Sequence, residues 1–257
     1  MEEKLYTIPV MDAFKVDCEC PLCKMRDDIE NDNISFAMGP SYMEDYVRFE
    51  TDEKGYCTRH VKKLYEYNNR LGLALIMETH LKNVKKQVDT LSKEKSSGGL
   101  FKKKEKKPIT EYLDKLNGSC FVCDRLNDTF DRYVATILYL WKKEDKDFLE
   151  LYKNCKGFCF EHLNALLKYA DKELSGNKFD EFNKMTIDIF EQNLDRTIED
   201  VEWFIKKFDY RYKDEPWKNS KDALVRTMYK TNGVTDEEWN KYNSFTCYEV
   251  VKNNIIK

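Results

Sequence analysis

The sequence is poor in the residues that interrupt helices. Of its 257 residues only 5 are proline and 9 are glycine, too few for the many turns of a β-sandwich or a barrel. Lysine, glutamate, aspartate, leucine and tyrosine are frequent instead. We therefore expect an all-α protein, long enough for one large domain or two smaller ones.

Long hydrophobic runs are also missing. The longest apolar run, residues 134–141, is interrupted by Thr136 and is far too short to span a bilayer. The opening residues, MEEKLYTIPV, have neither the basic n-region nor the apolar h-region of a signal peptide. We expect a cytoplasmic protein that does not enter a membrane.

No single sign of charge dominates the chain. Its 44 Lys and Arg against 47 Asp and Glu give a net charge of −3, which provides no general basic field for nucleic acid. Residues 93–107 are the exception, with seven lysines and two glutamates. A solvated linker explains this run better than a phosphate or lipid surface, so nucleic acid is not an expected partner.

Histidine is scarce, with 3 residues, yet two of the three belong to a pattern with six of the 9 cysteines. The pattern is Cys-x2-Cys, a long spacer, then Gly-aromatic-Cys-x2-His. It occurs twice, at Cys20, Cys23, Gly55, Cys57 and His60, and again at Cys120, Cys123, Gly157, Cys159 and His162. The spacers between the two halves are 33 and 35 residues long. A duplicated unit of about 100 residues is the simplest interpretation.

Three cysteines and one histidine form a normal tetrahedral zinc set. Since each repeat contains such a set, we expect two structural sites, one per repeat: Cys20, Cys23, Cys57 and His60, and Cys120, Cys123, Cys159 and His162. Each ligand pair is expected at a helix N-terminus, where free N–H groups favour thiolate. Two zinc ions per chain are favoured, an iron–sulfur cluster is the alternative metal, and inert buried cysteines are the interpretation without metal.

Four residues of these types lie outside the pattern. Cys18, Cys155 and Cys247 are expected to be small packed side chains, although Cys155 could exchange with Cys159 in a redox reaction. His80 is expected at the core or edge of a long helix. A thioredoxin-like role for Cys-x2-Cys requires a βαβ setting, which the sequence does not predict.

The apolar periodicity predicts helices along the whole chain, with turn formers between them. We expect a first metal-binding unit at 1–91, a Lys-rich linker at 92–108, a second unit at 109–213 and a helical extension at 214–257. The predicted helices are 24–36, 41–49, 58–91, 109–116, 124–143, 147–153, 163–174, 180–212, one starting at Pro216 and one at 236–253. Residues 245–251 are ambiguous between helix and strand.

These motifs resemble a known family. The two Cys-x2-Cys and Gly-aromatic-Cys-x2-His segments, with Glu215-Pro216-Trp217 followed by Asp222-Ala223, are similar to a domain of unknown function found in anaerobic Gram-positive bacteria. The resemblance covers nearly the whole chain. Some members carry the label of an ABC-transporter substrate-binding protein. The resemblance implies the metal pattern and no specific activity.

No catalytic residue is predicted, because no phosphate-binding Gly-rich loop, nucleophile elbow or His-Glu-x-x-His motif occurs. The favoured function is a cytosolic zinc-stabilised scaffold or interaction module with a protein partner. One alternative is an enzyme or small-molecule-binding protein with an aromatic-lined pocket between helices. The other is a thiol or metal sensor that uses Cys18 and Cys155.

Overall fold

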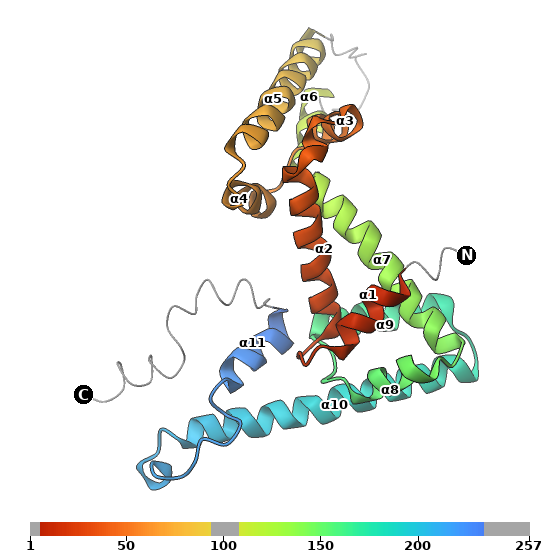
Figure 1. The fold of residues 1–257 in the computed structure, drawn as a ribbon, viewed down its shortest axis with the longest axis vertical. Helices are drawn as coiled ribbons and strands as arrows, with labels where there is room; N and C mark the ends of the chain where they lie inside the picture. The colour runs from red at the N-terminus through yellow and green to blue at the C-terminus, as the bar shows by residue number, and fades with distance from the viewer. Residues whose placement is uncertain (1–5, 94–107, 234–257) are drawn as a thin grey trace, which may run out of the picture. The chain divides into compact units, whose positions relative to one another are not determined.

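A computed structural model describes residues 6–93 and 108–233 of the chain (Figure 1). Within these residues it contains eleven α-helices, two short 3₁₀ segments and no strand. The helices are α1 Thr7–Lys15, α2 Pro21–Met38, α3 Asp45–Lys54, α4 Thr58–Glu66, α5 Arg70–Lys93, α6 Pro108–Asn117, α7 Phe121–Lys142, α8 Lys146–Asn154, α9 Phe160–Glu173, α10 Asn177–Lys206 and α11 Ala223–Asn232. The predicted all-α class is confirmed.

Three helix predictions need correction. The expected helix 58–91 is two helices, α4 and α5, because Asn68 adopts a left-handed conformation with φ of 70° between them. Helix α11 begins at Ala223 and not at Pro216, and it ends as predicted at Gly233, whose φ is 61°. Helix α1 was not predicted from the sequence. The predicted helix 236–253, residues 245–251, Cys247 and most of the Lys-rich linker lie outside the described residues.

Contacts between Cα atoms divide the chain into two compact units that do not follow the order of the sequence. One, here called the terminal unit, combines residues 1–27 with 131–257, and the other, the middle unit, is residues 28–130. The boundaries fall inside α2 and α7, so that each of these helices contributes to both units.

The terminal unit has a core of aromatic side chains. Tyr152 on α8 is fully buried, and the rings of Phe14, Trp141, Phe148, Phe158 and Phe182 pack around it with centroids 5.6–5.9 Å away. Helix α1 packs on α8, while α10 packs on both α9 and α11. Each of these aromatic side chains buries a large apolar surface.

The middle unit has a smaller core of aliphatic residues in which helix α3 packs against α5. Its buried members are Ile34, Ala37, Met38, Val47, Leu64, Leu73, Ile76, Cys120, Phe121 and Val122. Cys120 is therefore both a core residue and a candidate metal ligand. Core packing and the candidate site are continuous in this unit.

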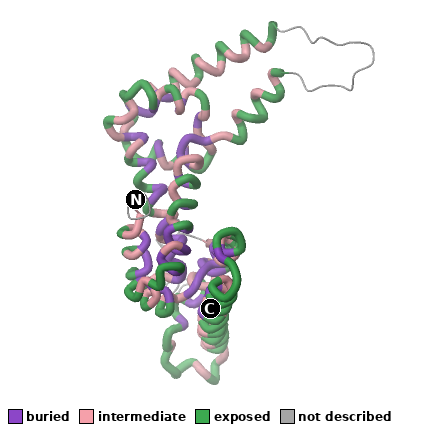
Figure 2. The backbone as a smooth tube through the Cα atoms, turned by 90° about the vertical axis from the view of Figure 1, so that its right-hand side faces the viewer, coloured by how far each residue is buried: buried purple, intermediate pink, exposed green. Residues whose placement is uncertain are grey.

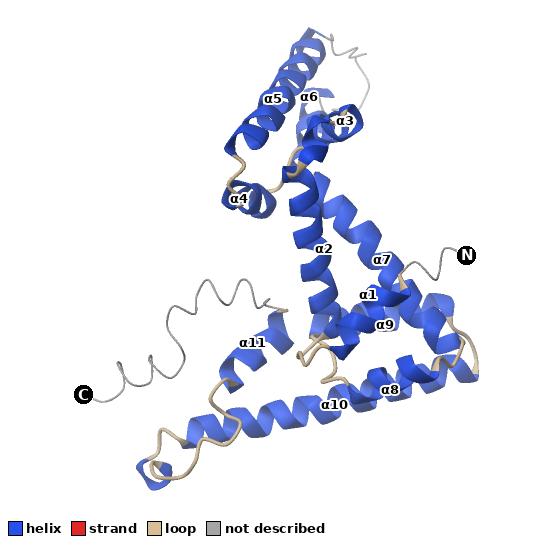
Figure 3. Cartoon of the chain, viewed as in Figure 1, coloured by secondary structure: helices blue, strands red, loops and turns tan. Residues whose placement is uncertain are grey.

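Burial alternates with exposure along individual helices, as expected of amphipathic helices with one apolar face (Figure 2). Helices make up nearly all of the drawn ribbon, and loops only join them (Figure 3). Among the described residues, no helix combines the length and the apolar character needed to cross a membrane.

The hydroxyl groups of Tyr152 and Thr186 provide a test of the aromatic core. The two oxygens are 2.7 Å apart, and both residues are fully buried. Tyr152→Phe removes the partner of the Thr186 hydroxyl, so the free energy of unfolding should fall by about 1–2 kcal/mol in urea denaturation. Tyr210→Phe, at a residue that is 87% exposed, should change it by less than about 0.5 kcal/mol. Equal effects of the two substitutions would contradict the packing described.

Candidate metal centre

Four helices begin at the predicted ligand pairs. Helices α2, α7, α4 and α9 start directly after Cys20, Cys120, Cys57 and Cys159. The carbonyl of each of these cysteines accepts the first helical hydrogen bond, from the N–H of Lys24, Asp124, Val61 and Leu163, at 2.9–3.2 Å. Each cysteine is therefore an N-cap residue, and its partner three positions later lies in the first helical turn. The prediction that the ligand pairs lie at helix N-termini is confirmed.

This position explains the spacing of two residues between ligands. Side chains at the N-cap and at the third helical position approach each other, as they do in a capping box. In α7 the N–H of Cys123 points at the sulfur of Cys120, 3.5 Å away. Free N–H groups and the helix dipole favour negative charge at this end, which suits thiolates.

The first group of donors, here called site I, lies in the terminal unit. Nδ1 of His162 lies 3.2 Å from Sγ of Cys23, 3.3 Å from Sγ of Cys159 and 3.5 Å from Sγ of Cys20. The sulfurs of Cys23 and Cys159 are 3.6 Å apart. All four residues are buried.

The second group, site II, lies in the middle unit. Nδ1 of His60 lies 3.2 Å from Sγ of Cys120 and 3.3 Å from the sulfurs of Cys57 and Cys123. Cys57 and Cys123 are separated by 3.8 Å. His60 and Cys120 are buried, whereas Cys57 and Cys123 are only half-buried.

The pairing differs from the one predicted. Each Cys-x2-Cys segment meets the Cys-x2-His segment of the other half of the sequence, so neither group forms within one repeat. Helix length gives the physical reason. The 18 residues of α2 carry the chain about 27 Å away from Cys20, and the 10 residues of α3 rise only about 15 Å, too little to return the chain to Cys20. In the second half, α7 with 22 residues is likewise much longer than α8 with 9.

The donor separations fit a tetrahedral ion. Bonds of about 2.3 Å to sulfur and about 2.0–2.1 Å to nitrogen require edges of about 3.8 Å between sulfurs and about 3.5 Å between sulfur and nitrogen. The observed sulfur–sulfur distances are 3.6 and 3.8 Å, and the sulfur–nitrogen distances are 3.2–3.5 Å. Both groups can therefore bind a metal ion with four protein ligands.

Crowding of the sulfurs separates their pKa values. In site II, burial and the charge of Cys120 raise the pKa of Cys123 to about 12. Burial also raises the pKa of Cys120, but His60 and the N–H groups of Cys57 and Cys123 lower it to about 6. In site I, hydrogen bonds with Cys20 and Cys23 lower the pKa of Cys159. Hydrogen bonds with Cys159 and Cys20 raise the pKa of Cys23. A divalent cation offsets this repulsion and allows all three sulfurs of a site to ionise.

Glu30 of α2 orients His60 in site II. Its side chain is 2% exposed, and Oε1 lies 2.8 Å from Nε2 of His60. Lys63 and Arg59 donate to Oε2 at 2.8 and 3.0 Å. Burial opposes the charge of Glu30, yet His60, Lys63 and Arg59 lower its pKa to about 2. An ionised Glu30 accepts a hydrogen bond from Nε2–H of His60. The Nδ1 lone pair then faces the sulfurs, as it does in carboxylate–histidine–metal sites.

Site I has a different supporting group, the buried Lys230 of α11. Its Nζ donates to the carbonyls of Glu19, at 2.6 Å, and of Lys156. The carboxylate of Glu19 lies 3.2 Å from the same Nζ and also accepts from Arg196 at 2.6 Å. Glu19 precedes Cys20, and Lys156 is three residues before Cys159, so Lys230 joins the two segments that supply the ligands of site I.

Gly55 and His80 shape the approach to Cys57. The φ of Gly55 is 59°, and a Cβ there would lie 2.8 Å from the ring of His80. Nδ1 of His80 lies 2.9 Å from the carbonyl oxygen of Asp52. His80 therefore packs on the segment before Cys57, and it belongs to neither group of metal donors. Its position on α5 agrees with the predicted role as a helix-edge histidine.

Cys18 and Cys155 lie in the terminal unit, half-buried and outside both groups. Burial raises the pKa of Cys155 to about 11, which disfavours a reactive thiolate there. No disulfide joins any of the eight cysteines that the structure describes.

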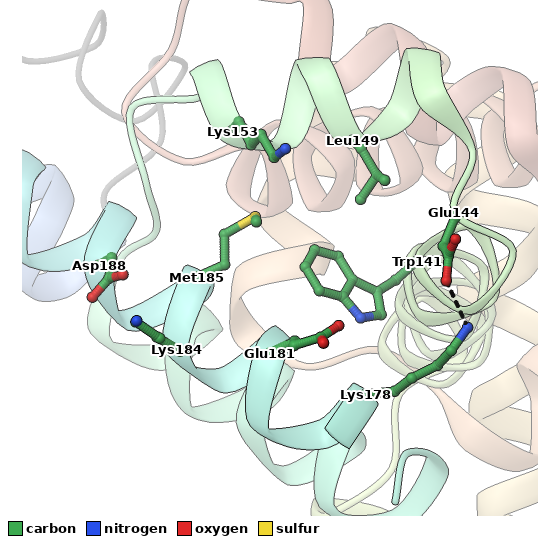
Figure 4. Close-up of a pocket in the computed structure, with 9 residues that line it drawn as sticks. All are labelled: Trp141, Glu144, Leu149, Lys153, Lys178, Glu181, Lys184, Met185 and Asp188. Atoms are coloured by element: carbon green, nitrogen blue, oxygen red, sulfur yellow. Dashed lines mark hydrogen bonds and ion pairs between the residues drawn. The ribbon is translucent and has the colours of Figure 1, made fainter. Parts of the chain in front are cut away.

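The terminal unit contains a pocket between helices, but this pocket does not have the aromatic lining that the small-molecule alternative predicted. Its volume is about 430 Å³, and Figure 4 shows Trp141, Leu149 and Met185 facing it from α7, α8 and α10. The charged residues around these apolar walls are Glu144, Lys153, Lys178, Glu181, Lys184 and Asp188. Only one aromatic ring lines the pocket, and no cysteine or histidine does. The pocket is therefore separate from both metal-donor groups.

Sequence reasoning missed the supporting residues Glu30, Glu19 and Lys230. Their local sequence does not distinguish them, since Asp28, Asn31 and Asp32 surround Glu30 and Thr231 and Asn232 follow Lys230. Charged residues make up 35% of the chain, and most such residues face solvent.

Substitution of Glu30 should weaken site II alone. Glu30→Gln removes the negative acceptor of the His60 proton, so metal affinity of one site should fall about 10–100-fold in a chelator competition titration. Glu78→Gln removes an exposed ion pair with Lys82 and should leave both affinities unchanged. An unaltered affinity in Glu30→Gln would rule out the orienting role.

The family can now be identified. A family model described as a family of unknown function, DUF6062, matches residues 1–238. Comparison with curated proteins found no match, and comparison with solved structures found none either. Because the match covers most of its length, the chain belongs to the DUF6062 family.

Proposed function

We propose that the protein binds two zinc ions and that these cross-link its helices into a scaffold. The single observation that supports this most strongly is the grouping of three sulfurs and one imidazole nitrogen at tetrahedral distances, twice in one chain. Thiolate and imidazole donors favour zinc over magnesium or calcium. With four protein ligands per ion, no coordination position is left for a substrate, which supports a structural role.

An interaction with another protein is the biological role we favour for this scaffold. Tyr46 and Phe49 are three residues apart on α3, and their exposed fractions are 58% and 65%. Exposed apolar side chains at one side of a helix are typical of surfaces that contact protein partners.

Binding of a small molecule is a second candidate function, supported by the pocket at Trp141 (Figure 4). Its volume lies in the range of ligand pockets, and it combines apolar walls with charges of both signs. A thermal-shift screen with small amphipathic compounds tests it. Stabilisation that Trp141→Leu abolishes would support binding, and no stabilisation by any compound would count against it.

The cellular setting follows from the cysteines. Free thiols that bind zinc require a reducing compartment, so we propose the cytoplasm.

Elemental analysis tests the proposal directly. The purified chain should contain about two zinc per molecule, and Cys57→Ala should contain about one, because site II loses a ligand. Cys155→Ala, at a half-buried cysteine outside both sites, should keep two. Stoichiometric iron with visible charge-transfer absorption, or a protein that keeps its fold without any metal, would contradict the proposal.

A further inference from the structure

We infer that the two sites have different tasks: site II exchanges its metal ion with external thiol or chelating ligands, while site I retains its ion. This inference rests on the proposed function, because it requires that both sites bind metal. It adds an activity, the donation or uptake of one soft divalent cation per chain.

The ligands of site I are out of reach of solvent. Cys20 and Cys159 are 0% exposed, Cys23 is 2% exposed and His162 is 3% exposed. In site II only His60 and Cys120 are buried to this degree, and Cys57 and Cys123 are half-buried. An external donor can therefore approach two of the four ligands of site II in the folded protein.

Helix α11 covers site I. Gly233, at its C-terminal end, lies so close that a Cβ there would be 3.7 Å from the sulfur of Cys159 and 3.9 Å from that of Cys23. Tyr229, one turn earlier, is buried, with 7% of its surface exposed. An external ligand can reach site I only after α11 detaches.

Lys230 opposes that detachment. Its buried ammonium donates to the carbonyls of Glu19 and Lys156 and pairs with the carboxylate of Glu19. Detaching α11 would break these bonds together and would leave the Glu19 carboxylate paired with Arg196. Opening of site I therefore requires a local unfolding step that site II does not need.

Exchange at site II is a ligand substitution without electron transfer. The external donor takes the ion, and the freed sulfurs remain as thiolates or take protons from water. The ion of site I stays in place during this reaction, so the terminal unit keeps its cross-link. The chain would thus deliver or accept one ion while the terminal unit remains folded around the other.

The kinetics of zinc release test this inference on the full-length chain loaded with two zinc. The absorbance of the complex with 4-(2-pyridylazo)resorcinol should rise in two phases of equal amplitude, the first at least about tenfold faster than the second. Release in one phase would overturn the inference while leaving two zinc sites intact. A chain that binds no zinc would instead overturn the proposed function.

Modification by N-ethylmaleimide identifies the site that reacts first. The sulfur adds to the carbon–carbon double bond of the reagent, and the adjacent ring carbon takes up a proton. Mass spectrometry should find Cys57 and Cys123 labelled during the fast phase, before Cys20, Cys23 and Cys159. Equal labelling of the two sites, or earlier labelling of site I, would contradict the inference.

Lys230→Met tests the role of α11. The variant should accelerate the slow phase of release at least about fivefold and leave the fast phase unchanged. Lys82→Met, at an exposed lysine on α5, is the matched control and should alter neither phase. A slow phase unchanged in Lys230→Met would refute the covering role. If this variant does not fold, the labelling order in the unaltered protein still decides the inference.

Discussion

The meeting of two helix N-termini at four metal donors is the constraint on which each unit depends. Each terminus contributes an N-cap cysteine and a second ligand one turn later, within 4.8 Å of the pair from the other helix. Structural zinc contributes apparent binding free energies of about 10–16 kcal/mol in finger peptides, as large as the total stability of an ordinary domain. Helices with modest cores of their own can therefore depend on such a link.

The sequence predicted those features that depend on residues close together in the chain. The spacing of Cys20 and Cys23 predicted a ligand pair at a helix N-terminus, and Gly233 marked a helix end. The pairing of the halves was not predictable, because Cys57 and Cys159 offer the same chemistry to either Cys-x2-Cys pair. Their choice depends on the lengths of the helices between the ligand pairs, which neighbouring residues encode weakly. Glu30 and Lys230 were missed since their burial is decided by tertiary packing.

Two sites with the same donor set have different surroundings. Site II has Glu30 behind His60 and two half-buried cysteines. The position of Glu30 in the second half of the sequence, 100 residues later, is occupied by Phe130, which has no acceptor for an imidazole proton. Site I instead lies beneath α11, held by Lys230. Identical ligand sets can thus bind one retained and one exchangeable ion. The residues around the ligands determine how the ligands are oriented and how easily solvent reaches them.

The most direct test of the account is the zinc content of two double variants. Cys57→Ala with Cys123→Ala removes two ligands of site II, so this variant should retain about one zinc per chain. Cys23→Ala with Cys57→Ala removes one ligand from each site, so this variant should retain almost none. If metal bound within each half of the sequence, the two results would be exchanged. One zinc in the Cys23 and Cys57 variant and none in the Cys57 and Cys123 variant would contradict the account.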